Sequence, residues 1–236
     1  MKVFGVVPAA GIGRRFGSKI PKQYQQLAGK TILEHSILRL QAGADLESIR
    51  VALHETDQYW PMLSDEIRQS VQVVSGGAQR SDSVRLAMAS ITNAQPDDCV
   101  LVHDAVRPLL DPKKVAELIE TLSAGEPGAI LAIPVHDTIK QAGADQSIDK
   151  TLDRSALWAA QTPQVFRFGL LKEALDSTQG DDQITDEASA MEACGHRVRL
   201  YEGHRSNIKI TCQEDLALAE YLIKMTSAQM KTATGQ

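Results

Sequence analysis

Cysteines are few in this sequence, and their scarcity excludes two classes of protein. The 236 residues include only three cysteines, Cys99, Cys194 and Cys212. They lie far apart, are odd in number and form no CxxC pair, so neither a zinc site nor a disulfide framework is indicated. Reduced thiols are typical of the cytoplasm, which is where we expect this protein to act.

Long hydrophobic runs and an excess of positive charge are also missing. No apolar run approaches the roughly 20 residues that a membrane helix needs. The apolar stretch over residues 3–7 is soon followed by charged residues, so it indicates a buried strand and not a signal peptide. The formal net charge is −5, whereas a nucleic-acid binder usually carries clustered basic residues. We therefore expect no membrane and no nucleic acid as a partner, and any anionic ligand must be held by local positive charge.

Short apolar runs alternate with amphipathic stretches along most of the chain. This alternation is typical of parallel strands joined by crossover helices. The expected strands are Val3–Val7, Ile49–Leu53, Val71–Val74, Cys99–His103 and Ala129–Pro134. We predict an α/β fold with a Rossmann-like, mostly parallel sheet flanked by helices. It forms a single domain over residues 1–225, followed by a flexible tail over 226–236.

Three helices are expected from capping signals and apolar stripes. Thr31 with Glu34, and Thr211 with Glu214, match the capping box, and another helix is expected after Ser81. Apolar residues recur at helical spacing behind each of these starts. Packing against the sheet explains the stripes, and we assign them no other role.

The alternation breaks between Val135 and Phe166. This segment carries two polar, strand-like runs around an Ala-Gly-Ala-Asp turn and has too few apolar residues to bury itself against its own domain. An isolated hairpin is marginally stable in water. We predict a protruding β-arm at about 135–160 that pairs with a second copy of the chain in a homodimer; a surface flap is the alternative.

The strongest local feature is the loop between Pro8 and Tyr24. Its small residues would let backbone amides approach a phosphate closely, and four cations follow: Arg14, Arg15, Lys19 and Lys22. The loop comes at the carboxyl end of the first strand, where parallel sheets bind ligands. Neither a Walker A loop nor a dinucleotide fingerprint fits, because Phe16 stands where each needs a glycine. The sequence predicts a phosphate site here, with a solvated basic loop as the alternative.

Further motifs extend this loop into a family resemblance. PAAGxGxR and PKQ are followed by GGAQRSDSV (76–84), VHDAVRP (102–108), HDTIK (136–140), TLDRSALWAAQTPQVF (151–166), TDEASAME (185–192) and EGHRSNIKIT (202–211). In this order they resemble the family of 2-C-methyl-D-erythritol 4-phosphate cytidylyltransferases. The resemblance implies transfer of CMP from CTP to that polyol phosphate, with release of pyrophosphate, in non-mevalonate isoprenoid precursor biosynthesis. It also implies Mg²⁺ and a homodimer. Ala78 departs from the polar or acidic residue that many relatives carry, which leaves backbone contacts from the preceding glycines.

Site residues follow from the motifs and this resemblance. Arg15 and Lys22 are expected to be catalytic, stabilising charge on the α- and β-phosphates. The expected nucleotide-binding residues are Pro8, Ala9, Ala10, Gly11, Gly13, Gly76, Gly77 and Ser83. The expected acceptor-binding residues are Arg107, Thr138, Arg154, Thr185 and Lys209, with Thr138 and Arg154 reaching across the dimer. Asp104 is expected to support Mg²⁺, and His103 to be structural.

The chemistry expected of such a site needs no strong base. A phosphate monoester has a second pKa of about 6, so its oxygen is already a nucleophile at neutral pH. Transfer then depends on positioning and electrostatic stabilisation. Three alternatives stay open: a ribitol-5-phosphate cytidylyltransferase, a nucleotide sensor without activity, and an NAD-dependent oxidoreductase. The oxidoreductase would need a carboxylate after the second strand, where Glu55 and Asp57 lie.

Overall fold

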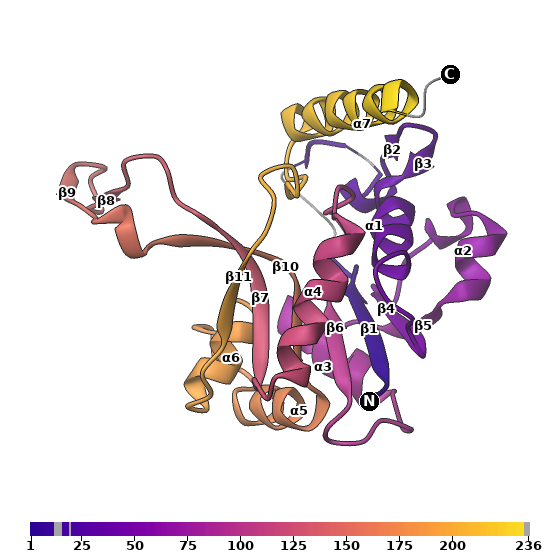
Figure 1. Cartoon of the computed structure of the whole chain (residues 1–236), viewed down its shortest axis with the longest axis horizontal. Coiled ribbons are helices and arrows are strands. Elements are labelled where there is room, and N and C mark those ends of the chain that lie inside the picture. Colours follow the sequence, from indigo (N-terminus) through magenta and orange to yellow (C-terminus); the bar gives the residue numbers. More distant parts are fainter. Residues whose placement is uncertain (12–15, 19, 234–236) are drawn as a thin grey trace.

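A seven-stranded sheet forms the centre of the molecule (Figure 1). The computed structural model describes residues 1–11, 16–18 and 20–233, with side chains up to residue 225. The strands are β1 (Val3–Pro8), β4 (Ser48–Leu53), β5 (Gln72–Ser75), β6 (Cys99–Val102), β7 (Gly128–Pro134), β10 (Trp158–Arg167) and β11 (Arg199–Glu202). They lie in the order β11-β7-β10-β6-β1-β4-β5. Neighbours pair in parallel, except that β10 runs antiparallel to both β6 and β7. The predicted α/β class is confirmed.

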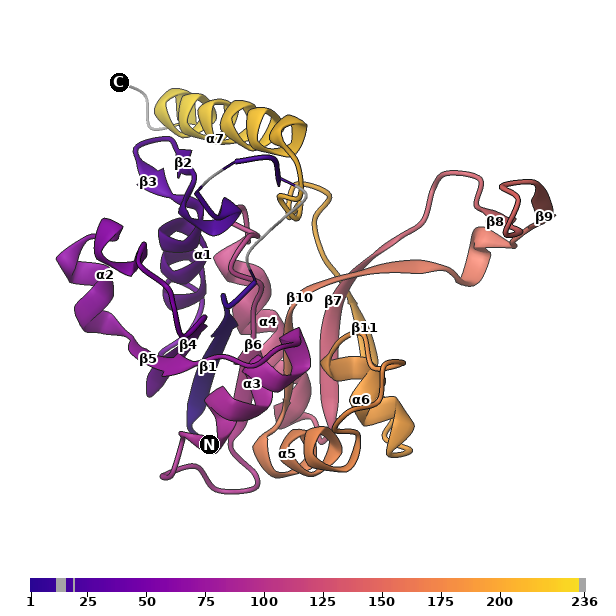
Figure 2. The same cartoon turned by 180° about the vertical axis from the view of Figure 1, so that it is seen from behind.

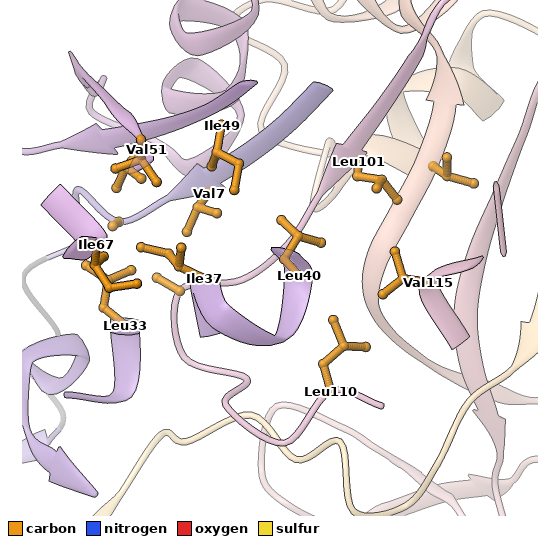
Figure 3. Packing of buried hydrophobic residues seen from close by; sticks show 14 of the residues in the cluster. Val7, Leu33, Ile37, Leu40, Ile49, Val51, Ile67, Leu101, Leu110 and Val115 are labelled. Atoms are coloured by element: carbon orange, nitrogen blue, oxygen red, sulfur yellow. The ribbon is translucent and has the colours of Figure 1, made fainter. Parts of the chain in front are cut away.

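Helices cover both faces of this sheet. On one face lie α1 (Ile32–Gln41), α2 (Asp65–Ser70) and α4 (Pro112–Ser123), and on the other α3 (Arg80–Ala89), α5 (Phe168–Ser177) and α6 (Glu187–Ala193). Side chains alternate between the faces: Val7 packs with the first group of helices, whereas Val6 packs with the second. Figure 3 shows the apolar cluster between the sheet and the first group of helices, where Ile37 and Leu40 of α1 pack against the strands. Burial on both faces explains why the strands read as continuous apolar runs.

All five predicted strands are present, with bounds that differ by a residue or so, but β10 and β11 were missed. The expectation that the segment up to Phe166 could not bury itself in its own domain was wrong for Gln161–Phe166, which is buried in β10. Polar residues there are satisfied by hydrogen bonds. The side chain of Gln164 donates to Asp186 Oδ2 (2.8 Å) and accepts from the backbone amide of Ala188 (3.1 Å). Such pairing removes most of the cost of burying an amide.

The last helix, α7 (Gln213–Ala233), packs over a small hairpin of β2 (Gln26–Leu27) and β3 (Lys30–Thr31). The predicted capping box at Thr31 and Glu34 is confirmed at the start of α1. At the start of α7 the predicted partner is wrong, because Asp215 and not Glu214 accepts from the backbone amide of Thr211 (2.7 Å). The helix extends to Ala233, past the boundary at 226 where a flexible tail was predicted.

A two-stranded arm projects from the body of the molecule (Figures 1 and 2). Its strands, β8 (Lys140–Ala142) and β9 (Ile148–Thr151), pair antiparallel, and every residue in them is exposed. The short helix η4 (Arg154–Ala156) leads back towards β10. The predicted hairpin is therefore present. Within the described parts of the chain, no helix has the length and apolar character needed to cross a membrane.

Candidate active site

A pocket opens at the carboxyl ends of β1 and β6, as predicted for the phosphate loop. Its lining comes from five segments of the chain: Pro8–Gly11, Lys22–Gln23, Gly77–Arg80 with Ser83, Asp104–Val106, and Lys209. The pocket thus brings together most of the predicted nucleotide-binding residues with Lys22, Asp104 and Lys209. Two predicted residues, Gly13 and Arg15, lie outside the described residues.

Gln23 anchors the start of the phosphate loop. It follows Lys22 in the short helix η2 (Lys22–Tyr24) and is only 4% exposed. Its side-chain amide donates to the carbonyl oxygens of Ala9 (2.8 Å) and Gly11 (3.1 Å). The first residues of the loop, Ala9 to Gly11, are therefore tied to the short helix that carries Lys22 at its start. Sequence reasoning missed Gln23, although its place in the PKQ motif, directly after a predicted catalytic lysine, was a usable signal.

The Gly76-Gly77 turn forms another wall, and both glycines are required by close approach. A Cβ on Gly76 would lie 2.5 Å from Ala10 Cβ, and a Cβ on Gly77 would lie 2.2 Å from Asp82 Cβ. The amide of Gly77 donates to Ser83 Oγ (3.1 Å), so Ser83 holds the turn from the first part of α3. The turn packs directly against Ala10 of the phosphate loop, so Gly77 and Ala10 form adjoining walls of the pocket.

Asp104 lies at the centre of a cluster of cations. Its Oδ1 accepts from Arg80 Nε (3.0 Å), and its Oδ2 lies 3.0 Å from Lys209 Nζ and 3.3 Å from Arg107 Nε. We call Asp104, Arg80, Arg107 and Lys209 the Asp104 cluster. Burial alone would raise the pKa of Asp104, but the positive charges of Arg80, Lys209 and Arg107 outweigh it and hold that pKa far below its usual range. Asp104 is therefore a carboxylate at any physiological pH.

Arg80, a member of the Asp104 cluster, and its partner Glu187 escaped the sequence analysis. Arg80 lines the pocket, and its Nη1 donates to both carboxylate oxygens of Glu187, at 2.7 and 2.8 Å. Glu187 is fully buried at the start of α6, more than a hundred residues from Arg80. An Arg within GGAQRSDSV and a Glu within TDEASAME gave no local sign of pairing, because only the fold brings these motifs together.

His103 and Arg107 form the buried layer behind Asp104. His103 is fully buried, with Nδ1 at 3.0 Å from Thr162 Oγ1 and Nε2 at 3.1 Å from the Arg107 carbonyl. Burial lowers the pKa of His103 to about 4, so its ring is neutral at physiological pH, and the predicted structural role is supported. Arg107 Nη1 donates to the Asn207 carbonyl (2.7 Å), and Arg107 is only 8% exposed. Its guanidinium is thus already engaged inside the protein.

The remaining predicted acceptor residues do not meet the pocket within one chain. Thr138 and Arg154 are exposed on the arm, and Arg154 donates to the carbonyl of His136. Thr185 is exposed just before α6. None of these three lines the pocket as far as the described residues define it. Bringing them to the ligand therefore requires a rearrangement or a second chain.

These contacts bear on the dinucleotide alternative and on how a metal ion would be held. Asp57, the candidate ribose carboxylate of an oxidoreductase, accepts from the Tyr24 hydroxyl (2.9 Å) and from the backbone amides of Tyr59 and Trp60, so it is used internally. For a metal, the described parts of the chain contain no group of three or more His, Cys, Asp or Glu residues suited to hold an ion. Both oxygens of Asp104 already face cations. The described side chains alone therefore do not form a metal cage, and a bound nucleotide would have to supply further ligands.

Comparisons with known proteins agree with the geometry. The family model described as 2-C-methyl-D-erythritol 4-phosphate cytidylyltransferase matches residues 3–225. A relative of that name from Vibrio vulnificus is 47% identical over 92% of this chain and 93% of its own. A relative of the same name from Pseudomonas entomophila is 45% identical over 90% of this chain and 92% of its own. The solved structure of the Francisella tularensis enzyme of this name superposes with a TM-score of 0.79 at 35% identity, over 94% of this chain and 99% of the other. The structure of the Thermus thermophilus enzyme of this name superposes with a TM-score of 0.78 at 30% identity, over 95% of this chain and 100% of the other.

Proposed function

Because the chain belongs to the 2-C-methyl-D-erythritol 4-phosphate cytidylyltransferase family, we propose that it transfers CMP from CTP to 2-C-methyl-D-erythritol 4-phosphate. The products are 4-diphosphocytidyl-2-C-methyl-D-erythritol and pyrophosphate, in non-mevalonate isoprenoid precursor biosynthesis. One observation carries the proposal: a single pocket at the carboxyl edge of the sheet is lined by Pro8–Gly11, by Lys22, and by Asp104 with Arg80 and Lys209.

The proposed reaction is an in-line displacement at the α-phosphorus of CTP. A phosphate oxygen of the acceptor attacks that phosphorus, the bond to the bridging oxygen of the β-phosphate breaks, and pyrophosphate leaves with the electron pair. The attacking oxygen needs no base, because a phosphate monoester is largely dianionic above a pKa of about 6. What the chain must supply is alignment and positive charge. Lys22 lies in the pocket wall and would stabilise charge that develops on the triphosphate, with Arg15 in the same role.

Each substrate has a proposed place. The cytosine and ribose would lie against the Gly77 turn, where Gly77 and Ala78 line the pocket. A wall of backbone groups can select a pyrimidine by size and hydrogen-bond pattern. The acceptor phosphate would lie near Lys209, whose side chain is 41% exposed and also touches Asp104.

Mg²⁺ is proposed to enter with the nucleotide. The ion commonly keeps several waters and binds one or two carboxylates together with substrate phosphates. Asp104 is the one carboxylate among the described residues that line the pocket, and its oxygens already face three cations. The triphosphate would therefore supply most of the ligands. When bound, the ion would neutralise charge on the phosphates.

The arm supports a homodimer as a further part of the proposal. Ile148 and Trp158 expose 65% and 37% of their surface on and beside the arm, which costs free energy unless something covers them. Thr138 and Arg154 are exposed on the same segment, so a second copy could bring them to the acceptor. Light scattering after gel filtration tests this: a strict monomer at micromolar concentration contradicts it. We also propose a cytoplasmic location, in keeping with three free cysteines.

Measurement of pyrophosphate release tests the activity. The purified protein is incubated with CTP, Mg²⁺ and either 2-C-methyl-D-erythritol 4-phosphate or ribitol 5-phosphate. We expect release with the first acceptor and little with the second. A preference for ribitol 5-phosphate would instead favour the sister activity, and CTP binding without release would indicate a sensor.

A further inference from the structure

Glu187 is a buried carboxylate that is paired with Arg80. It is fully buried, and within the described parts of the chain its carboxylate accepts hydrogen bonds only from Arg80. A buried, unpaired charge is very costly, so a chain that keeps one there must balance it. Arg80 does so with Nη1 and uses Nε for Asp104.

The start of α6 does not depend on Glu187. Asp186 is the N-cap of that helix: its Oδ1 accepts from the amide of Ser189 (2.9 Å), and Ser189 Oγ accepts from the amide of Asp186 (3.1 Å). This capping box satisfies the first turn without Glu187. The helix is also held by Ala188, Ala190 and Met191, which pack in the core. The helix therefore has capping and packing contacts that do not involve the ion pair.

The ion pair does reach the pocket. Arg80 is half-buried and lines it, Asp104 is buried beside it, and Lys209 lies on the far side of Asp104. A chain of contacts thus runs from Glu187 to Arg80 (2.7 Å), to Asp104 (3.0 Å) and to Lys209 (3.0 Å). Its two carboxylates alternate with two cations, and Arg107 is a further cation on Asp104.

We propose that Glu187 is a positioning residue for the acceptor: through Arg80 it fixes Asp104, and through Asp104 it fixes the ammonium group of Lys209. This inference rests on the proposed function, because Lys209 is taken as the acceptor contact. Without the charge on Glu187, Arg80 is drawn towards Asp104 alone. Asp104 then turns with it, and Lys209 loses the partner that holds it in the pocket. Glu187 touches no substrate itself.

Steady-state kinetics of Glu187→Gln test the proposal. Glutamine keeps the shape and one acceptor oxygen but removes the charge. We expect the KM for the acceptor to rise about tenfold, as is common when a supporting partner of a site residue is lost, while the KM for CTP changes less than about twofold. Glu192→Gln, on the exposed side of α6, is the matched control and should match the wild type. A merely structural role would lower the amount of active enzyme without raising one KM selectively, and that result would overturn the proposal, as would wild-type kinetics.

Two further measurements secure the interpretation. If Glu187 acts through Arg80, the double variant Glu187→Gln/Arg80→Met should have the same acceptor KM as Arg80→Met alone. An acceptor KM raised by the product of the two single effects would refute the chain of contacts. If Glu187→Gln does not fold, Arg80→Lys is the second variant. Lysine keeps the positive charge but cannot contact both carboxylates as the guanidinium does, so it should raise the acceptor KM in the same way. In a crystal structure of Glu187→Gln, Lys209 should no longer lie within hydrogen-bond distance of Asp104; an unchanged distance between them overturns the inference whatever the activity. Inactivity of the wild type would refute only the proposed function.

Discussion

Replacing Asp104 by asparagine should expose how much of the stability depends on one buried charge. Asp104 is 5% exposed and faces three cations at 3.0, 3.0 and 3.3 Å. Asparagine has the same shape but offers one acceptor oxygen, so at least one of the three contacts is lost and the others lose the negative charge that strengthens them. Such hydrogen bonds contribute about 1.5–3 kcal/mol each, and breaking one partner of a buried ion pair costs about 3–5 kcal/mol. We expect the free energy of unfolding to fall by about 3–5 kcal/mol at pH 7.

The loss should depend on pH in one direction. The folded-state pKa of Asp104 lies far below its usual range, whereas the unfolded value is about 3.9. The charge therefore stabilises the wild type fully above about pH 5, and this contribution disappears as the pH falls through the folded-state pKa. The difference between wild type and Asp104→Asn should shrink steadily below about pH 4.

Urea unfolding followed by tryptophan fluorescence, at one protein concentration and several pH values, measures this. Asp97→Asn is the control, because Asp97 is exposed and the change in net charge is the same. A difference below about 1 kcal/mol at pH 7, within the range of an exposed ion pair, would refute the reasoning. So would a large difference that stays constant down to about pH 2.

Three other changes have clear expected outcomes. Lys22→Ala should lower kcat by several orders of magnitude while the melting temperature stays near that of the wild type; near-normal turnover would remove Lys22 from the mechanism. Gln23→Met should raise the KM for CTP, because the carbonyls of Ala9 and Gly11 lose their donor, and Gln26→Met, at an exposed position of β2, should not. Gly77→Ala should destabilise the protein by about 1–3 kcal/mol, the usual cost of overpacking, since the new Cβ would meet Asp82 Cβ at 2.2 Å; an unchanged melting temperature would contradict the close approach.

The fold was predictable where one physical signal dominated. The strands β1, β4 and β6 are buried on both faces, so their apolar runs stand out in the sequence. β10 gave no such signal, because Gln161, Thr162 and Gln164 are polar and buried by virtue of partners elsewhere in the chain. β11 could not be predicted either, because it lies at the edge of the sheet and its largely exposed residues form no apolar run.

The site was predictable to the extent that its residues are local. Pro8–Gly11 and Lys22 come after one strand, and the topology of a parallel sheet places the residues after a strand at its carboxyl edge. Asp104 was predicted as a metal ligand because it is a carboxylate directly after a strand, and that role stays a prediction. Its contacts with three cations were not predicted, because Arg80 and Lys209 come from distant segments of the chain. Pairing between residues 80 and 187, or 104 and 209, depends on the folded chain and cannot be read from either motif alone.

The two roots of the arm lie side by side, and this has a consequence for how the chain can change. Trp158 pairs with Pro134, so the polypeptide leaves β7 and re-enters β10 at adjacent points of one ladder. A segment with neighbouring entry and exit can be lengthened, shortened or exchanged without altering the frame that carries it. The length and shape of the arm can therefore change between relatives, or in an engineered variant, while the central sheet and the pocket at its edge keep their shape.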